Sequence, residues 1–154
     1  MVVASGLLKA FDRGNIGRDK STEGTFLRAA ARACGWRFYD IEECPIPRSY
    51  AWARVEHWNE TSFILLHDRG AAAAFAATGD PAECWNFRYV DRPDFVKAAA
   101  DLEIPIRFLS AAELAHELTS DDRAFIAGLD SSMAYDVRYW NPQTVSHVLF
   151  NFWD

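Results

Sequence analysis

The stretch RSYAWARVEHWNETSFILLHD, residues Arg48–Asp68, decides the fold that we predict for this chain. Apolar and polar side chains alternate on both sides of the polar pair Asn59-Glu60, a pattern that is typical of two strands joined by a tight turn. With the turn centred on this pair, Trp52 lies opposite His67. The stretch therefore predicts a β-hairpin at the centre of an antiparallel sheet.

The two faces of this hairpin differ in composition, because successive side chains of a strand point to opposite faces. One face is small and apolar and suits packed helices; it carries Ala51, Ala53, Val55 and His57. The other mixes aromatic rings with charge and carries Tyr50, Trp52, Arg54, Glu56 and Trp58. Such a mixture is typical of protein contact surfaces, although an ordinary ion pair between Arg54 and Glu56 on a solvated face is the more frequent arrangement. The binding site predicted from this hairpin comprises Arg48, Tyr50, Trp52, Arg54, Glu56, Trp58 and His67.

The rest of the chain alternates between helical and strand patterns. The predicted helices are Val2–Asp12, Thr22–Cys34 with Thr22 as its cap, Arg92–Leu102 with Asp91 as its cap, Ser110–Leu118 with a Ser110–Glu113 capping box, Asp121–Gly128, and a last helix from Asn141 to Phe152. The further predicted strands are Trp36–Cys44, Ala71–Thr78, Glu83–Val90 and Ile104–Leu109. The alanine run Ala71–Thr78 favours a helix by propensity, but its short length between two turn signals favours a strand. Asp130–Tyr139 is predicted to be irregular.

This element order predicts an α+β fold with a single, largely antiparallel sheet of about 4–6 strands. Helices are expected mainly on one face, and a C-terminal helix closes the core. The β–α–β passage from Glu83 to Leu109 makes the sheet mixed if its last strand runs parallel to its first. The 154 residues predict one domain, residues 1–154, whose 50% hydrophobic content is enough for a packed core without disulfides or metal.

Charge and cysteine content restrict the class of protein. The net charge is −6 and the basic residues do not cluster, which argues against a nucleic-acid partner or an anionic membrane surface. No apolar run is long enough to span a membrane. Three cysteines without a Cys-x-x-Cys pair, and an N-terminus unlike a signal peptide, predict a reduced, cytoplasmic protein.

No motif points to a cofactor, a metal or a nucleophile. No two of the four histidines stand four residues apart, and the hairpin holds His57 and His67 at opposite ends. The glycine loops that bind nucleotide phosphates and the Gly-x-Ser-x-Gly turn of hydrolases are missing from the sequence. We therefore predict neither a cofactor nor a metal site.

Two functional hypotheses remain. The preferred one is a small, acidic, cytoplasmic protein-binding module, such as an inhibitor or immunity-type protein that masks a basic partner. The alternative is a small enzyme or ligand-binding domain with a pocket between the sheet and the C-terminal helix. That pocket would use Glu23, Arg28, Arg54, Glu56 and His67. An exposed Trp52 or Trp58 on a flat surface favours the module, whereas a deep pocket favours the alternative.

Overall fold

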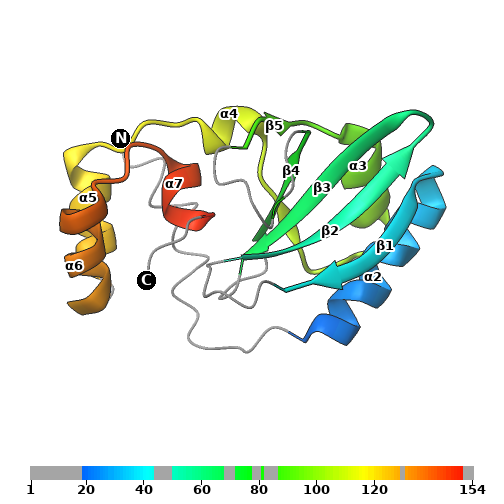
Figure 1. Cartoon of the computed structure of the whole chain (residues 1–154), viewed down its shortest axis with the longest axis horizontal. Helices are drawn as coiled ribbons and strands as arrows, with labels where there is room; N and C mark the ends of the chain where they lie inside the picture. The colour runs from blue at the N-terminus through cyan, green and yellow to red at the C-terminus, as the bar shows by residue number, and fades with distance from the viewer. Residues whose placement is uncertain are drawn as a thin grey trace.

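A computed structural model of the chain describes residues 19–43, 50–67, 72–77, 81, 87–128 and 131–150. This part contains six helices and a six-stranded sheet, so the predicted α+β class is confirmed (Figure 1). The strands are β1 (Arg37–Glu42), β2 (Tyr50–His57), β3 (Glu60–His67), β4 (Ala72–Ala76), β5 (Tyr89–Val90) and β6 (Arg107–Phe108). The helices are α2 (Lys20–Cys34), α3 (Pro93–Asp101), α4 (Ala111–Leu114), α5 (Ser120–Ala127), α6 (Ser131–Trp140) and α7 (Val145–Leu149).

The sheet is largely antiparallel, as predicted, with one parallel pair. Its strands follow the order β1-β2-β3-β4-β5, and β6 also pairs with β4. β5 pairs antiparallel with Phe75 and Ala76, whereas β6 pairs parallel with Ala72 and Ala73. β5 and β6 therefore run in opposite directions along one edge of β4. The sheet is mixed, but not through the alternative left open for the passage from Glu83 to Leu109. Its two strands, β5 and β6, run in opposite directions, and β6 is parallel to β4 instead.

The alanine run forms strand β4, which confirms the prediction of a strand. Every residue of β4 is buried. Ala73 and Phe75 belong to one apolar cluster, and Ala74 and Ala76 belong to another on the opposite face of the sheet. The high helix propensity of alanine is overridden because small side chains let both layers approach this strand closely.

Helices cover parts of both faces of the sheet, rather than mainly one. On the first face, α2 and α3 contribute Leu27 and Phe95 to a cluster with the small side chains of β2. The second cluster takes Leu114, Ile126, Val137, Val145 and Leu149 from helices α4 to α7. Figure 1 shows α5, α6 and α7 gathered at one end of the molecule, away from the β2–β3 turn. The described helices therefore cover the second face only toward that end.

Helix α2 begins earlier than predicted. Its cap is Asp19, not Thr22, and the Asp19 carboxylate accepts hydrogen bonds from the backbone N–H groups of Ser21 and Thr22. The Thr22 hydroxyl also donates to this carboxylate, and these bonds hold the pKa of Asp19 below its ordinary value. An aspartate is favoured at the N-terminal end of a helix, because its negative charge interacts favourably with the helix dipole. Gly35, with φ of 81°, ends the helix as predicted.

The C-terminal third differs most from the prediction. Helix α6 spans Ser131–Trp140, whereas Asp130–Tyr139 is predicted to be irregular, so that prediction is wrong. The last helix begins at Val145 after Thr144, not after Asn141, because Thr144 forms a β-bridge with Glu117. The predicted capping box of Ser110 and Glu113 is confirmed on the short helix α4.

Several predictions fall outside the part of the chain that the structure describes. They are the helix Val2–Asp12, the first residues of the strand Glu83–Val90, and Phe152. Among the described helices, none combines the length and apolar character that a membrane span requires.

Candidate functional site

The register of the β2–β3 hairpin places its turn one residue earlier than predicted. His57 pairs with Glu60 and Tyr50 pairs with His67, so the turn consists of Trp58 and Asn59. The pairing has shifted by two residues, which leaves the side chains of β2 on their predicted faces, while Trp58 moves from the predicted strand into the turn. His57 and His67 lie at opposite ends of the hairpin, as predicted.

The predicted site divides into a buried half and an exposed half. Tyr50, Trp52 and His67 are buried at the end of the hairpin that α7 covers. Trp52, only 4% exposed, donates its indole N–H to Glu42 at 3.0 Å. Arg54, Glu56 and Trp58 lie at the other end, where the described helices leave this face uncovered. Arg48 lies outside the described residues.

Packed aromatic rings occupy the place where the alternative hypothesis put a pocket. Tyr50 meets Phe150 edge to face, with ring centroids 6.1 Å apart, and Tyr89 lies 6.1 Å from the same ring. His67 approaches Phe150 at 6.5 Å. These rings belong to the cluster between the sheet and α7. Phe150, the residue that directly follows α7, therefore fills this position in the core with its ring.

The five polar residues of the alternative pocket lie apart. Arg28, on α2, donates to Asp40 at 2.6 Å on the side of the sheet that α2 covers. Arg54 and Glu56 lie on the opposite face, and His67 is at the far end of the hairpin. The fold does not gather them around one cavity.

At the end of this face that the described helices leave uncovered, Glu56 joins two strands through hydrogen bonds. One carboxylate oxygen accepts from the Tyr39 hydroxyl at 2.8 Å, and the other accepts from Arg54 Nε at 3.0 Å and from an Arg54 terminal nitrogen. The Tyr39 hydroxyl, and after it the Arg54 guanidinium, hold the pKa of Glu56 below its ordinary value. The hydrogen bond to Glu56 also raises the pKa of Arg54. The predicted ion pair therefore exists within a wider network.

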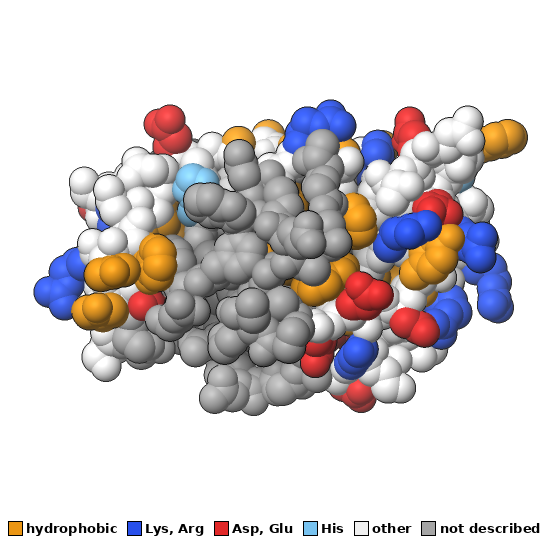
Figure 2. Space-filling view, viewed as in Figure 1, with side chains coloured by type: hydrophobic (Ala, Val, Ile, Leu, Met, Phe, Trp, Pro, Cys, Tyr) orange, Lys and Arg blue, Asp and Glu red, His pale blue; other side chains and the backbone are white. Residues whose placement is uncertain are grey.

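Two guanidinium groups lie over the ring of Tyr39. The central carbon of Arg54 is 4.6 Å from the ring centroid, and that of Arg37 is 5.0 Å away. Arg37 pairs with Glu56 in the β1–β2 register. Figure 2 shows positive, negative and hydrophobic side chains interspersed over this part of the molecule.

Sequence reasoning missed Arg37 and Tyr39 as members of the site. Simple alternation placed Tyr39 and Ile41 on the same face of the strand. The β1–β2 register is irregular between Phe38 and Ile41, so Ile41 packs in the α2 cluster while Tyr39 reaches Glu56 on the other face. A bulge of this kind leaves no reliable mark in the sequence.

The turn itself presents an exposed tryptophan. The Trp58 side chain is 91% exposed, and its φ of 54° lies in the left-handed region. Beneath it, His57 stacks on Trp36 with ring centroids 4.9 Å apart. Arg92 lies over the Trp36 ring and donates to the buried Ser62 hydroxyl at 2.9 Å. The residues next to the exposed Trp58 ring are therefore well packed against one another.

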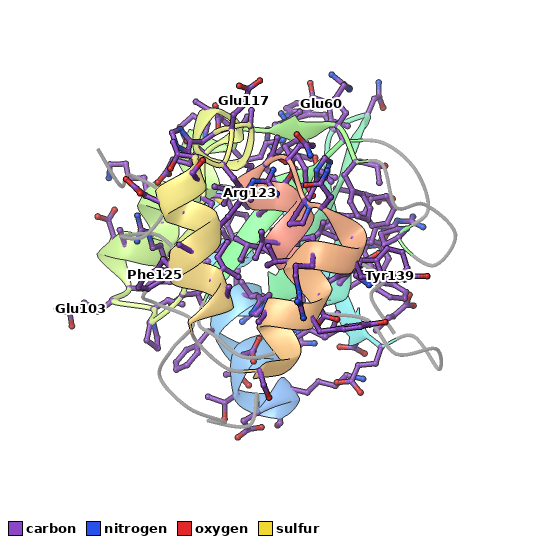
Figure 3. The ribbon with its side chains drawn as sticks, turned by 90° about the vertical axis from the view of Figure 1, so that its left-hand side faces the viewer. Glu60, Glu103, Glu117, Arg123, Phe125 and Tyr139 are labelled. Atoms are coloured by element: carbon purple, nitrogen blue, oxygen red, sulfur yellow. The ribbon has the colours of Figure 1, made fainter. Side chains whose placement is uncertain are left out.

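A second group of exposed aromatic residues lies on α6. Tyr135 and Tyr139 stack with ring centroids 5.7 Å apart, and Trp140 lies next to Tyr139. All three are exposed. Figure 3 shows Tyr139 on the side of α6 that faces away from Phe125 of α5.

In the described part of the chain, no observation supports a metal-binding site or a reactive thiol. No cluster of three histidine, cysteine or acidic side chains is placed there to hold a metal ion. Burial raises the pKa of the Cys34 thiol, which disfavours the nucleophilic thiolate. Cys44 and Cys84 lie outside the described residues.

No protein-family model matches this chain, and no curated protein or solved structure is significantly similar to it. The arguments for a function therefore come from the geometry of the hairpin and its neighbours.

Proposed function

We propose that this protein is a protein-binding module. Its contact surface, the hairpin surface, consists of Arg37, Tyr39, Arg54, Glu56 and Trp58. Trp58 carries the proposal, because its exposed ring and its left-handed backbone both act against the stability of the isolated chain.

The cost of Trp58 follows from elementary conformational energies. A residue with a Cβ atom loses about 1–2 kcal/mol in the left-handed region. Glycine or asparagine is the favoured residue at such turn positions. An exposed ring gains almost nothing from burial that could offset this cost. Strained residues of this kind cluster at functional sites, and tryptophan is enriched among residues that dominate binding energy.

Three other members of the hairpin surface are already held in place. Tyr39, Arg54 and Glu56 fix one another by hydrogen bonds and stacking. Side chains that are ordered before association lose less conformational entropy on binding. Tyrosine, arginine and tryptophan are also the residue types that protein interfaces favour. These features support a contact surface over an ordinary solvated sheet face.

The inhibitor or immunity-type role against a basic partner stays a prediction. It rests on the charge of −6 over the whole chain, whereas the hairpin surface combines two arginines with one glutamate. A small enzyme or ligand binder is the less favoured proposal, because packed rings lie where its pocket was expected.

Affinity capture from the native lysate tests the proposal when three proteins are compared. They are the wild type, Trp58→Ala, and the control Tyr135→Ala, which removes another exposed aromatic ring. We expect a stoichiometric protein to co-purify with the wild type and the control and to be absent with Trp58→Ala. Binding of the purified partner should weaken by about 30-fold in Trp58→Ala, as for a dominant interface residue.

Equal retention of the partner by Trp58→Ala and the wild type would refute the proposal. Release of a stoichiometric small molecule on denaturation, without any protein partner, would favour the ligand-binding alternative. Unfolding curves of both variants establish that the comparison is made between folded proteins.

A further inference from the structure

Arg37 is the part of the hairpin surface whose bonding groups remain available. It lies on the edge strand β1 and is exposed. Its guanidinium stacks on Tyr39 but makes no hydrogen bond or ion pair with any residue that the structure describes. Arg54, in contrast, already donates through two nitrogens to Glu56.

The neighbouring carboxylates are engaged elsewhere. Glu56 accepts from Tyr39 and Arg54, and Asp40 accepts from Arg28. Two guanidinium groups and one carboxylate therefore meet at Tyr39, which leaves one positive charge in surplus. This local surplus is opposite in sign to the net charge of −6 for the whole chain.

Stacking prepares Arg37 for an anionic group. When a guanidinium lies over an aromatic ring, the N–H groups at its edge stay free of the ring. A carboxylate can bind to two of them with two parallel hydrogen bonds. The ring also restricts the long side chain before binding, which reduces the entropy cost of association. An unstacked surface arginine offers the same charge without this restriction.

From these observations, and resting on the function proposed above, we infer that Arg37 binds a carboxylate of an acidic segment of the partner protein. Arg37 lies opposite Glu56, and Trp58 follows two residues after Glu56, in the turn directly beyond the end of β2. An extended segment with an acidic residue and an apolar residue two positions apart fits both groups. The charge of −6 opposes long-range approach of such a segment, so the contact acts at short range.

Nuclear magnetic resonance with two short peptides tests this inference. The probes are acetyl-Glu-Ser-Leu-amide and its neutral counterpart acetyl-Gln-Ser-Leu-amide, added at millimolar concentration to the isotopically labelled full chain. We expect the acidic peptide to shift the Arg37 Nε–H and Trp58 indole N–H signals and to bind at least about fivefold more tightly than the neutral one. Arg37→Gln should remove the difference between the two peptides.

The control variant is Arg32→Gln. Arg32 is an exposed arginine on α2, without a stacked ring or a hydrogen-bond partner among the described residues, and its replacement changes the net charge equally. We expect this variant to keep the preference for the acidic peptide. Urea unfolding of both variants verifies that the sheet is intact.

The outcomes separate this inference from the proposed function. If both peptides shift Trp58 equally and Arg37→Gln changes nothing, the carboxylate site is refuted while Trp58 remains a contact residue. If inorganic phosphate binds at Arg37 more tightly than the acidic peptide does, the assignment to a carboxylate is wrong. If the captured partner depends on Trp58 but binds Arg37→Gln with unchanged affinity, the inference also fails.

Discussion

Replacement of Trp58 by glycine should stabilise the fold while it weakens binding of the partner. The wild-type residue holds a φ of 54° with a side chain that is 91% exposed. Relief of the left-handed conformation returns about 1–2 kcal/mol, and the extra backbone entropy of glycine costs about 0.5–1 kcal/mol. The substitution also removes the edge-to-face packing of Trp58 on His57, whose ring centroids are 6.2 Å apart. The two backbone terms alone give a gain of about 0.7 kcal/mol in the free energy of unfolding, and the lost ring contact offsets part of it, so we expect a net gain below that value.

Urea unfolding followed by far-ultraviolet circular dichroism measures this gain. Fluorescence is less suitable because the substitution removes one of six tryptophans. Asn59→Gly is the matched control, since Asn59 is the other turn residue and is not among the described residues with positive φ. There, glycine contributes only its entropic cost, so we expect a loss of about 0.5–1 kcal/mol.

The reasoning is refuted if Trp58→Gly lowers the free energy of unfolding by about 1 kcal/mol or more, the size of loss typical of an ordinary point mutation. That result would show that the tryptophan contributes to folding, and its exposure could no longer be attributed to function. A stabilised variant that still binds the partner with wild-type affinity would refute the functional half alone.

Three further predictions concern stability. Phe95→Ala should lower the free energy of unfolding by about 3–5 kcal/mol, because this ring is fully buried between α3 and the sheet; a loss below about 1 kcal/mol in urea would contradict the packing. Ser110→Ala should cost about 1 kcal/mol by the same assay, because it removes the hydroxyl that caps α4, and an unchanged midpoint would contradict the capping box. The Tyr39 hydroxyl and the Arg54 guanidinium lower the pKa of Glu56 in the folded state, so Glu56 contributes stability above its ordinary pKa of about 4.3 and loses it as the pH falls through the lowered value. The difference in unfolding midpoint between the wild type and Glu56→Gln should therefore shrink on acidification, and a difference that does not change from pH 7 to pH 3 would contradict the network.

Local patterns in the sequence were sufficient for most of the fold. Strand alternation assigned Ala51, Ala53 and Val55 to the helix-covered face, because the period of two is a property of the backbone. Gly35 predicted the end of α2, since glycine adopts the left-handed region without strain. The capping box of Ser110 and Glu113 was equally local.

Errors arose where distant segments compete for the same backbone. Asn141 is a residue type that favours a helix N-cap. However, α7 begins only after Thr144, because Thr144 forms a β-bridge with Glu117. Ser131–Trp140 lacked a strong apolar period: among the described side chains of α6 only Val137 is buried, and Tyr135 and Tyr139 are exposed.

For the candidate site, too, the sequence determined one part and the tertiary structure determined the other. The sequence by itself determined that Trp52, Arg54 and Glu56 would share one face of a hairpin, whereas the register placed Trp58 in the turn. Only the tertiary structure decided that Trp52 is buried in a cluster with helices α4 to α7 and that the described helices leave the other end of that face uncovered. Burial depends on which distant segments pack on a surface, and a strand carries no local signal of its future neighbours. The pairing of β1 with β2 likewise added Tyr39 and Arg37, because the register between two strands, and not the sequence of either one, decides which residues of β1 lie beside Glu56.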